Sequence, residues 1–206
     1  MTKLSRVILL ALLSVCVVQF GALAQNLSGY LSGTLGPGTY TVVGNCEVQS
    51  GQTLTIVAGT RFEHTGNYAW TIRGRLNAEG TEADPIEFVR QQPITNHRWK
   101  GIRFEIGASN LSTLEWCNLD YVYTYLNGGA IYLNSVNIAI DHCTITNSEA
   151  GSGGGLYANY CTNGLVIENS TFSTNTAGNG GGMYFNSCNG SVVRNCVIDH
   201  NSATST

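Results

Sequence analysis

Short segments in which apolar and polar residues alternate run through the chain and are separated by Gly, Asn and Ser. Alternation with a period of two predicts strands that bury one face. In the first half of the chain these segments are 40–43, 54–56, 71–72, 86–88 and 102–104. The repeated units of the second half contain no ten-residue run with helical periodicity, so the pattern predicts an all-β fold.

A motif of about 25 to 27 residues recurs through the second half of the chain. One column of the motif has spacings of 26, 27 and 26 residues and contains Cys117, Cys143, Ser170 and Cys196. Between these positions lie three glycine-rich stretches that end in tyrosine, 128–132, 153–157 and 180–184. Repeats of this length, with short strands that stack about 4.8 Å apart, predict a parallel β-helix.

The alignment of the repeats also predicts the direction of each side-chain column. Three columns should point inward: the cysteine column, Ile131–Leu156–Met183 and Leu133–Ala158–Phe185. The residue before each cysteine-column position should form a tight left-handed bend, a conformation that Asn tolerates best after Gly. These bend residues are Trp116, His142, Asn169 and Asn195.

The first 24 residues have the features of a secretory signal peptide. Lys3 and Arg6 form a basic start, residues 7–20 are almost wholly apolar, and Ala22-Leu23-Ala24 fits a small-x-small cleavage site. We therefore predict a signal peptide at 1–24, followed by a β-helix domain at 25–206, in a secreted or cell-surface protein.

The alternatives to a cleaved leader are a membrane anchor and a lipoprotein site. A membrane anchor is disfavoured because the apolar run is shorter than the roughly 20 residues of a spanning helix. A lipoprotein site at Cys16 is disfavoured because Val15 is a poor fit before it and the apolar run continues past it. No later stretch is long and apolar enough to span a membrane, so we predict no membrane span after cleavage.

Composition excludes some functions. Charged residues make up 11% of the chain, with two lysines and a net charge of -3. A nucleic-acid-binding protein needs a basic face that displaces counterions, so we do not expect nucleic acid as a partner. The hydrophobic content of 43% also argues against a disordered chain.

Several motifs resemble known families. Gly51-Gln52-Thr53-Leu54-Thr55-Ile56 and Trp99-Lys100-Gly101-Ile102 are similar to the opening coils of bacterial secreted right-handed β-helix repeat proteins, in the pectate-lyase-like superfamily. Gly128-Gly129-Ala130-Ile131 and Phe172-Ser173-Thr174-Asn175 resemble the repeats of polymorphic outer-membrane proteins. The resemblance covers nearly all of the mature chain and implies one right-handed parallel β-helix (solenoid) of about seven coils. It leaves the function open, because the superfamily holds lyases, hydrolases, adhesins and passive stalks.

The resemblance also implies what a catalytic site would contain. Polysaccharide lyases of this fold use acidic Ca²⁺ ligands with an Arg or Lys base, and its glycoside hydrolases use clustered aspartates. The chain has no Asn-Thr-Asp, Asp-Asp or Gly-His-Gly motif, and the pairs Asp141-His142 and Asp199-His200 fall in different columns. We therefore predict no catalytic residues within this chain.

One column of the repeat is acidic and contains Glu115, Asp141 and Glu168, followed by Arg194. Stacked carboxylates repel one another unless a cation lies between them, and hard oxygen ligands suit Ca²⁺. The column is therefore a weak candidate for Ca²⁺, and no other cofactor is expected. The alternative, which we prefer, is that the acids splay into water and Arg194 compensates them at the end.

The outward tyrosine column is the candidate ligand-binding site. Its rings would present apolar planes with polar tips to sugars, and the neighbouring amides would supply hydrogen bonds. Arg103 extends the tyrosine column by one coil, and Glu105 extends the column of neighbouring asparagines by one coil. The alternative is a stacking ladder that only stabilises adjacent coils. The predicted ligand-binding residues are Arg103, Tyr132, Asn134, Tyr157, Asn159, Tyr184 and Asn186.

Signal cleavage would leave six cysteines, which we interpret as small buried core residues. Cys161 and Cys188 are 27 residues apart and should lie in neighbouring coils. They are the candidate pair for a disulfide if the compartment is oxidising. The chain has no Cys-x-x-Cys motif and no His/Cys spacing typical of zinc sites.

Three hypotheses for the function follow. The first is a non-catalytic, adhesin-like domain that binds polysaccharides or cell-surface glycans. The second is a polysaccharide lyase or glycoside hydrolase whose catalytic coils lie outside this chain, and the third is a structural stalk. No capping unit is visible after Ala203, so we also expect the fold to be truncated, with further coils or a sorting domain beyond Thr206.

Overall fold

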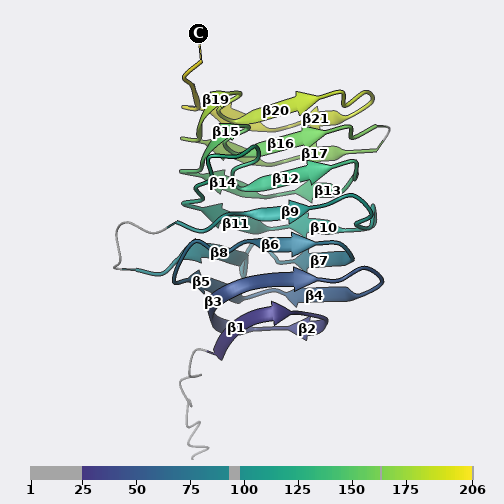
Figure 1. Cartoon of the computed structure of the whole chain (residues 1–206), viewed down its shortest axis with the longest axis vertical. Coiled ribbons are helices and arrows are strands. Elements are labelled where there is room, and N and C mark those ends of the chain that lie inside the picture. Colours follow the sequence, from purple (N-terminus) through teal and green to yellow (C-terminus); the bar gives the residue numbers. More distant parts are fainter. Residues whose placement is uncertain (1–24, 93–97, 163, 206) are drawn as a thin grey trace, which may run out of the picture.

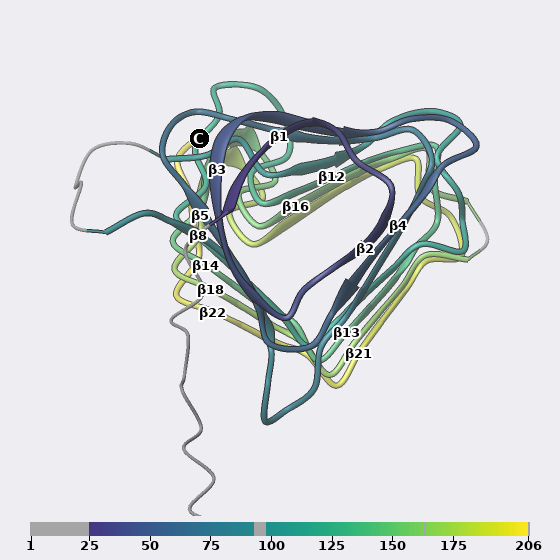
Figure 2. The ribbon, with the colours of Figure 1, turned by 90° about the horizontal axis from the view of Figure 1, so that it is seen from below.

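The computed structural model describes residues 25–92, 98–162 and 164–205. Over these residues the chain is an all-β parallel solenoid, and its coils stack in sequence order along one axis (Figure 1). Seen along that axis, the coils superimpose on a triangle with three sides (Figure 2). The predicted all-β class and parallel β-helix are confirmed, whereas the predicted signal peptide at 1–24 lies outside the described residues.

Each side of the triangle is a stack of parallel strands, and we name the sides faces A, B and C. Face A contains β6 (Trp70–Ile72), β9 (Ile102–Phe104), β12 (Ile131–Asn134), β16 (Leu156–Asn159) and β20 (Met183–Asn186). Face B contains β2 (Gly33–Leu35), β4 (Thr53–Val57), β7 (Arg75–Glu79), β10 (Thr113–Glu115), β13 (Ala139–Asp141), β17 (Val166–Glu168) and β21 (Val192–Arg194). Face C contains β5 (Thr60–His64), β8 (Ile86–Arg90), β11 (Cys117–Asp120), β14 (Thr144–Thr146), β18 (Thr171–Ser173) and β22 (Val197–Asp199).

The first coil is built differently from the rest. The long strand β3 (Gly38–Val48) joins two faces, because residues 38–42 pair with β5 on face C and residues 46–48 pair with β6 on face A. Strand β1 (Gln25–Tyr30) pairs with β3 on its other side. In the late coils a separate, three-stranded sheet fills the corner between faces C and A. This corner sheet contains β15 (Glu149–Ser152), β19 (Thr176–Asn179) and β23 (Ser202–Ala203).

Equivalent residues of successive coils pair directly. Ile131 is the partner of Leu156, and Leu156 is the partner of Met183. Face B holds seven stacked strands, and the chain completes about six turns between the first of them and the last. The predicted number of about seven coils therefore corresponds to the stacked strands rather than to complete turns.

The predicted inward columns form the core of the tube. Their members on β12 and β16 are fully buried. In the last described coil Met183 is only partly buried and Phe185 is 37% exposed, because no described coil lies over them. In the cysteine column Cys117, Cys143 and Ser170 are buried, as predicted.

The predicted bends adopt left-handed backbone conformations. The φ angles are 48° at Trp116, 50° at His142, 50° at Asn169 and 54° at Asn195. All four residues lie between a strand of face B and a strand of face C, so they form one corner of the triangle. The larger side chains also stack there, since the rings of Trp116 and His142 have centroids 4.2 Å apart.

Polar residues inside the tube are hydrogen-bonded from coil to coil. Asn175 is fully buried, and its side-chain nitrogen donates to the Ile145 carbonyl oxygen at 3.0 Å. Its side-chain oxygen accepts a hydrogen bond from the Ser148 backbone nitrogen at 3.0 Å. Asn201 repeats this arrangement one coil later and donates to the Phe172 carbonyl oxygen at 2.7 Å. These asparagines satisfy backbone groups that would otherwise be buried without partners.

Candidate functional site

The tyrosine column lies on the outer side of face A, where Tyr132, Tyr157 and Tyr184 are paired in register. The ring centroids of Tyr132 and Tyr157 are 5.8 Å apart with an interplanar angle of 8°, and those of Tyr157 and Tyr184 are 5.4 Å apart at 3°. Tyr157 lies between the other two rings and is only 8% exposed. Each ring therefore covers its neighbour, and the Tyr157 ring has no free face on which a sugar could stack.

The glycine-rich stretches explain where the tyrosines lie. A glycine with positive φ stands four residues before each ring, with φ angles of 75° at Gly128, 66° at Gly153 and 59° at Gly180. A Cβ added to Gly153 would lie 2.8 Å from the Cβ of Tyr157, and a Cβ at Gly128 would lie 2.6 Å from that of Tyr132. Only glycine tolerates both the left-handed backbone and this close approach.

Arg103 covers the first ring of the tyrosine column. Its guanidinium carbon lies 4.0 Å from the centroid of the Tyr132 ring, and its Nη1 donates to the Asn127 carbonyl oxygen at 3.2 Å. Burial lowers the pKa of Arg103, and the carboxylate of Glu105, with Oε1 3.8 Å from Arg103 Nε, acts in the opposite direction. Burial, followed by the charge of Glu105, raises the pKa of Tyr132. Arg103 is therefore already engaged with the column that it was predicted to extend.

The asparagine column forms a hydrogen-bonded ladder beside the tyrosines. The side-chain nitrogen of Asn159 donates to the side-chain oxygen of Asn134 at 3.2 Å. The side-chain nitrogen of Asn186 donates to the side-chain oxygen of Asn159 at 2.7 Å. These contacts use amide groups that were predicted to bind a ligand, so the side chains of each outer column mainly contact members of the same column.

The acidic column lies on face B, where Glu115 pairs with Asp141 and Asp141 with Glu168. Glu79 precedes them in register and was not predicted. Arg194 follows them, and its Nε lies 2.5 Å from Oε2 of Glu168. Within residues 25–92, 98–162 and 164–205 no group of three or more His, Cys, Asp or Glu side chains could hold a metal ion. Within the acidic column the Glu168 carboxylate is paired with Arg194, and Oδ1 of Asp141 accepts a hydrogen bond from the side-chain nitrogen of Asn169 at 2.8 Å.

A hollow at the corner between faces C and A brings together four residues that the sequence did not identify as a candidate site. It is lined by Asn67, Arg98, Tyr123 and Glu149. Arg98 Nη1 donates to Glu149 Oε2 at 2.7 Å, and the guanidinium carbon lies 5.7 Å from the centroid of the Tyr123 ring. Tyr123 is 39% exposed, in contrast to Tyr157. We name this site the corner hollow.

The corner hollow draws its residues from four separate turns of the chain. Asn67 follows β5, Arg98 precedes β9, Tyr123 follows β11 and Glu149 begins β15. A single parallel bridge pairs Tyr123 with Glu149, so two of the four are in register. Two sequence signals were available: the tyrosine at every second position of the segment 121–125, and the 26-residue spacing of Tyr123 and Glu149, which equals that of Cys117 and Cys143.

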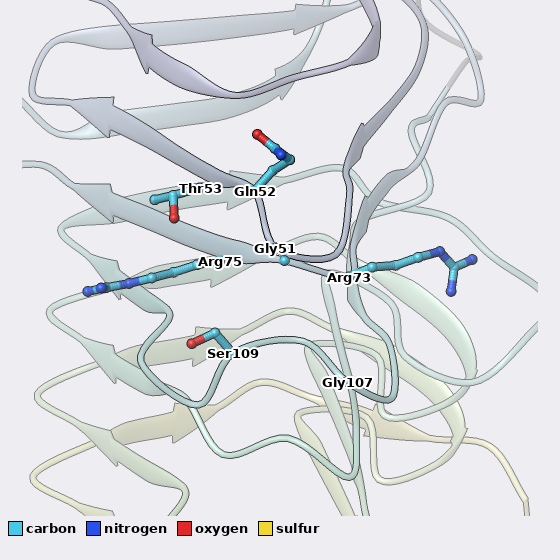
Figure 3. Close-up of a pocket in the computed structure, with 8 residues that line it drawn as sticks. Gly51, Gln52, Thr53, Arg73, Arg75, Gly107 and Ser109 are labelled. Atoms are coloured by element: carbon cyan, nitrogen blue, oxygen red, sulfur yellow. The ribbon is translucent and has the colours of Figure 1, made fainter.

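A second hollow lies at the corner between faces A and B in the early coils (Figure 3). Figure 3 shows that the side chains of its two arginines, Arg73 and Arg75, point in opposite directions. Arg73 Nε lies 3.4 Å from Glu47 Oε1, and Arg75 Nε donates to Asn77 Oδ1 at 2.8 Å. Because the charges diverge and each has an acceptor in the protein, this hollow does not form an anion site.

The two Asp-His pairs are well separated. Asp141 ends β13 on face B, and Asp199 ends β22 on face C, so the prediction that they lie in different columns is confirmed. Each histidine contacts its own neighbour, with Nδ1 of His142 2.9 Å from Asp141 Oδ1 and Nδ1 of His200 3.0 Å from Asp199 Oδ2. Because the two pairs lie on different faces, their carboxylates do not form the two-carboxylate arrangement of a glycosidase.

Comparison with known proteins agrees with this architecture. A family model described as right handed beta helix region matches residues 89–205, which is more than half of the chain. The chain therefore belongs to the right-handed β-helix family, and the predicted handedness is confirmed. No curated protein and no solved structure matched it. Across the described ranges, no helix has the length and apolar character needed to cross a membrane.

Proposed function

We propose that this protein is an exported, non-catalytic β-helix that binds glycans, in the manner of an adhesin. The observation that carries the proposal is the corner hollow, where the 39%-exposed Tyr123 lies beside the ion pair of Arg98 and Glu149. Ligand sites typically combine an apolar wall with a few convergent polar groups. The corner hollow offers both on one side of the tube.

The chemistry of the corner hollow suits a sugar ring. Sugars present a C–H face and a rim of hydroxyl groups, and a tyrosine ring offers a matching plane with a polar tip. Arg98 donates and Glu149 accepts hydrogen bonds, and Asn67 does both. The ion pair between Arg98 and Glu149 orients their side chains before a ligand arrives, which reduces the ordering cost of binding.

The adjoining face A is a secondary part of the proposed site. Arg103 donates to the carbonyl oxygen of Asn127, which ends the segment that carries Tyr123. The tyrosine column presents ring edges and hydroxyl groups rather than ring faces, because its rings cover one another. A glycan chain that occupies the corner hollow would therefore meet polar ring edges as it crosses face A.

Export is proposed from the leader, with its basic start, apolar run and Ala22-Leu23-Ala24. The similarity of the repeats to those of bacterial secreted and outer-membrane proteins supports the same location. An extracellular site also fits the low charge of the chain and its exposed polar Thr, Asn and Ser residues.

The first test is a screen of the chain for binding and turnover on a polysaccharide panel, with and without Ca²⁺. We expect binding without release of unsaturated or reducing products. Release of such products would contradict the non-catalytic proposal and favour a lyase or hydrolase. Loss of binding without Ca²⁺ would return attention to the acidic column of face B.

The second test places the ligand. Tyr123→Ala should weaken glycan binding by about fivefold, because an aromatic contact contributes on the order of 1 kcal/mol. Tyr30→Ala is the matched control, since Tyr30 is 72% exposed on β1 at the far end of the tube. Tyr157→Phe keeps the ring stack and removes one hydroxyl group. A loss for Tyr157→Phe with none for Tyr123→Ala would move the site from the corner hollow to the tyrosine column.

A second candidate function is a structural stalk, which the two outer ladders favour. The tyrosine rings stack on each other, and the asparagine amides donate to each other from coil to coil. Such contacts stabilise a solenoid without a ligand. If the chain binds no polysaccharide in the panel, the result favours the structural stalk over the glycan-binding function.

A further inference from the structure

The thiols of Cys161 and Cys188 occupy equivalent places in neighbouring coils. Each follows a face A strand and a left-handed bend, at Tyr160 with φ 53° and at Ser187 with φ 55°. The strands before them are paired in register up to Asn159 and Asn186, and the Tyr160 backbone nitrogen donates to the Asn186 carbonyl oxygen at 2.9 Å. Neighbouring strands lie about 4.8 Å apart, within the Cα separations of about 4.4–6.8 Å that disulfides require.

We propose that Cys161 and Cys188 form a disulfide that links these two coils when the exported chain meets a disulfide oxidant. The backbone nitrogen of Cys161 already donates to the Cys188 sulfur at 3.3 Å, so this sulfur rests against the partner residue. The Cys161 thiol instead donates to the Val136 carbonyl oxygen of the preceding coil at 3.1 Å. The Cys188 side chain is also a hydrogen-bond partner of the Cys161 side chain, so the two thiols are neighbours.

The two cysteines differ in access, and this sets the order of the reaction. Cys188 is partly exposed, whereas Cys161 is fully buried, and burial raises the pKa of Cys161 to about 11. The Cys188 thiolate attacks a low-molecular-weight disulfide, R–S–S–R, and releases RS⁻. The Cys161 sulfur then attacks the Cys188 sulfur of the mixed disulfide and releases the second RS⁻. The two thiol protons end on the released thiols, so two protein thiols and one R–S–S–R give one protein disulfide and two RSH.

Cys117 and Cys143 provide an internal comparison. They are also one coil apart, since the following residues Asn118 and Thr144 are paired in register. Both of these thiols are buried, so a soluble oxidant has no exposed sulfur to attack. The next member of their column is Ser170, which shows that serine is accommodated at this kind of position.

The test uses the full chain, purified under reducing conditions and then exposed to oxidised glutathione without denaturant. Peptide mapping by mass spectrometry should recover a cross-linked pair that contains Cys161 and Cys188, with the mass of two hydrogen atoms lost. The bridge spans 27 residues and should raise Tm by about 10 °C, reversed by dithiothreitol. Recovery of both cysteines as free thiols after oxidation, or a bridge between other cysteines, would overturn the proposal.

Two matched variants complete the test. Cys188→Ser should abolish both the cross-linked pair and the oxidation-dependent rise in Tm. Cys143→Ser should retain both, because it places a serine where the next coil already has Ser170. If Cys188→Ser still shows the full rise in Tm on oxidation, the stabilisation has another source and the proposed bridge is wrong. The peptide map of the unmodified chain decides the question even if a variant fails to fold.

Discussion

The early and late coils fill the same triangular tube in different ways. In the early coils the interior is a cluster of large rings. The centroids of Phe62 and Phe88 are 5.0 Å apart, and Trp70 meets Phe62 edge-on at 4.9 Å. In the late coils equivalent small residues stack from coil to coil, and the Cys143 backbone nitrogen donates to the Ser170 hydroxyl at 3.0 Å.

The difference shows that backbone pairing and side-chain filling are separate requirements. The same parallel pairing runs through all seven strands of face B, whichever residues lie inside. In a ring cluster the interior is close-packed by rings that each have different partners. In a ladder it is close-packed because the same contact repeats from coil to coil. Only the second solution leaves a period in the sequence.

The largest effect should come from the ring cluster. Trp70→Ala should lower the free energy of unfolding by about 3–5 kcal/mol, because it opens a cavity among fully buried rings. Trp116→Asn is the control, since Trp116 lies at a left-handed bend that holds Asn in two later coils. Urea unfolding followed by circular dichroism measures both. Equal costs for the two variants would show that the ring cluster does not hold the early coils together.

The next effect should come from the close backbone contacts of the late coils. A Cβ at Gly129 would lie 1.8 Å from the Gly154 carbonyl oxygen, and one at Gly154 would lie 2.4 Å from the Gly181 carbonyl oxygen. Gly129→Ala should therefore force two coils apart and cost about 3 kcal/mol in the same unfolding experiment.

Gly66→Ala is the control for this prediction. Its added Cβ would lie 3.1 Å from the ring of Tyr68, which is a side chain that can move, rather than from backbone. We expect a cost below about 1 kcal/mol. A similar cost for both glycines would mean that the late coils are not held at their closest backbone approach.

The last effect, the smallest when taken per single pH unit, is a pH dependence that arises in the early coils. His64 is fully buried, and its Nε2 accepts a hydrogen bond from Trp70 Nε1 at 3.0 Å, while its Nδ1 lies 2.8 Å from the Val89 carbonyl oxygen. Burial lowers the pKa of His64 from 6.5 to about 3, although the Val89 contact opposes the shift. Between these values the unfolded chain binds a proton that the folded chain does not, so stability falls as the pH falls.

Between these two pKa values, His64 alone should lower the free energy of unfolding by about 1.4 kcal/mol for each pH unit of acidification. Urea unfolding between pH 7 and pH 4 measures it, and His64→Gln should remove that part of the slope while leaving the contribution of the carboxylates. An unchanged slope in His64→Gln would show that His64 is protonated in the folded chain, contrary to its neutral role beside Trp70.

The candidate site was only partly predictable from the sequence. The registers of Tyr132, Tyr157 and Tyr184 follow from the repeat, because residues one period apart lie in adjacent strands. That the rings cover one another's faces does not follow from the repeat, because it depends on the side-chain torsion angles of the tyrosines. The corner hollow could not be predicted in this way, because Asn67 and Arg98 come from turns of the early coils that share no period with Glu149.

By itself, the sequence determined the all-β class, the stacked coils and the bends, because a fixed period in a parallel solenoid places like residues on top of one another. Only the tertiary structure decided which aromatic rings are open to a ligand. Tyr157 is covered on both faces by tyrosines one coil away, whereas Tyr123, whose register partner in the next coil is Glu149, is 39% exposed. The physical reason is that strand pairing is set by backbone geometry common to every coil, while exposure is set by the particular side chains and turns that meet at each place.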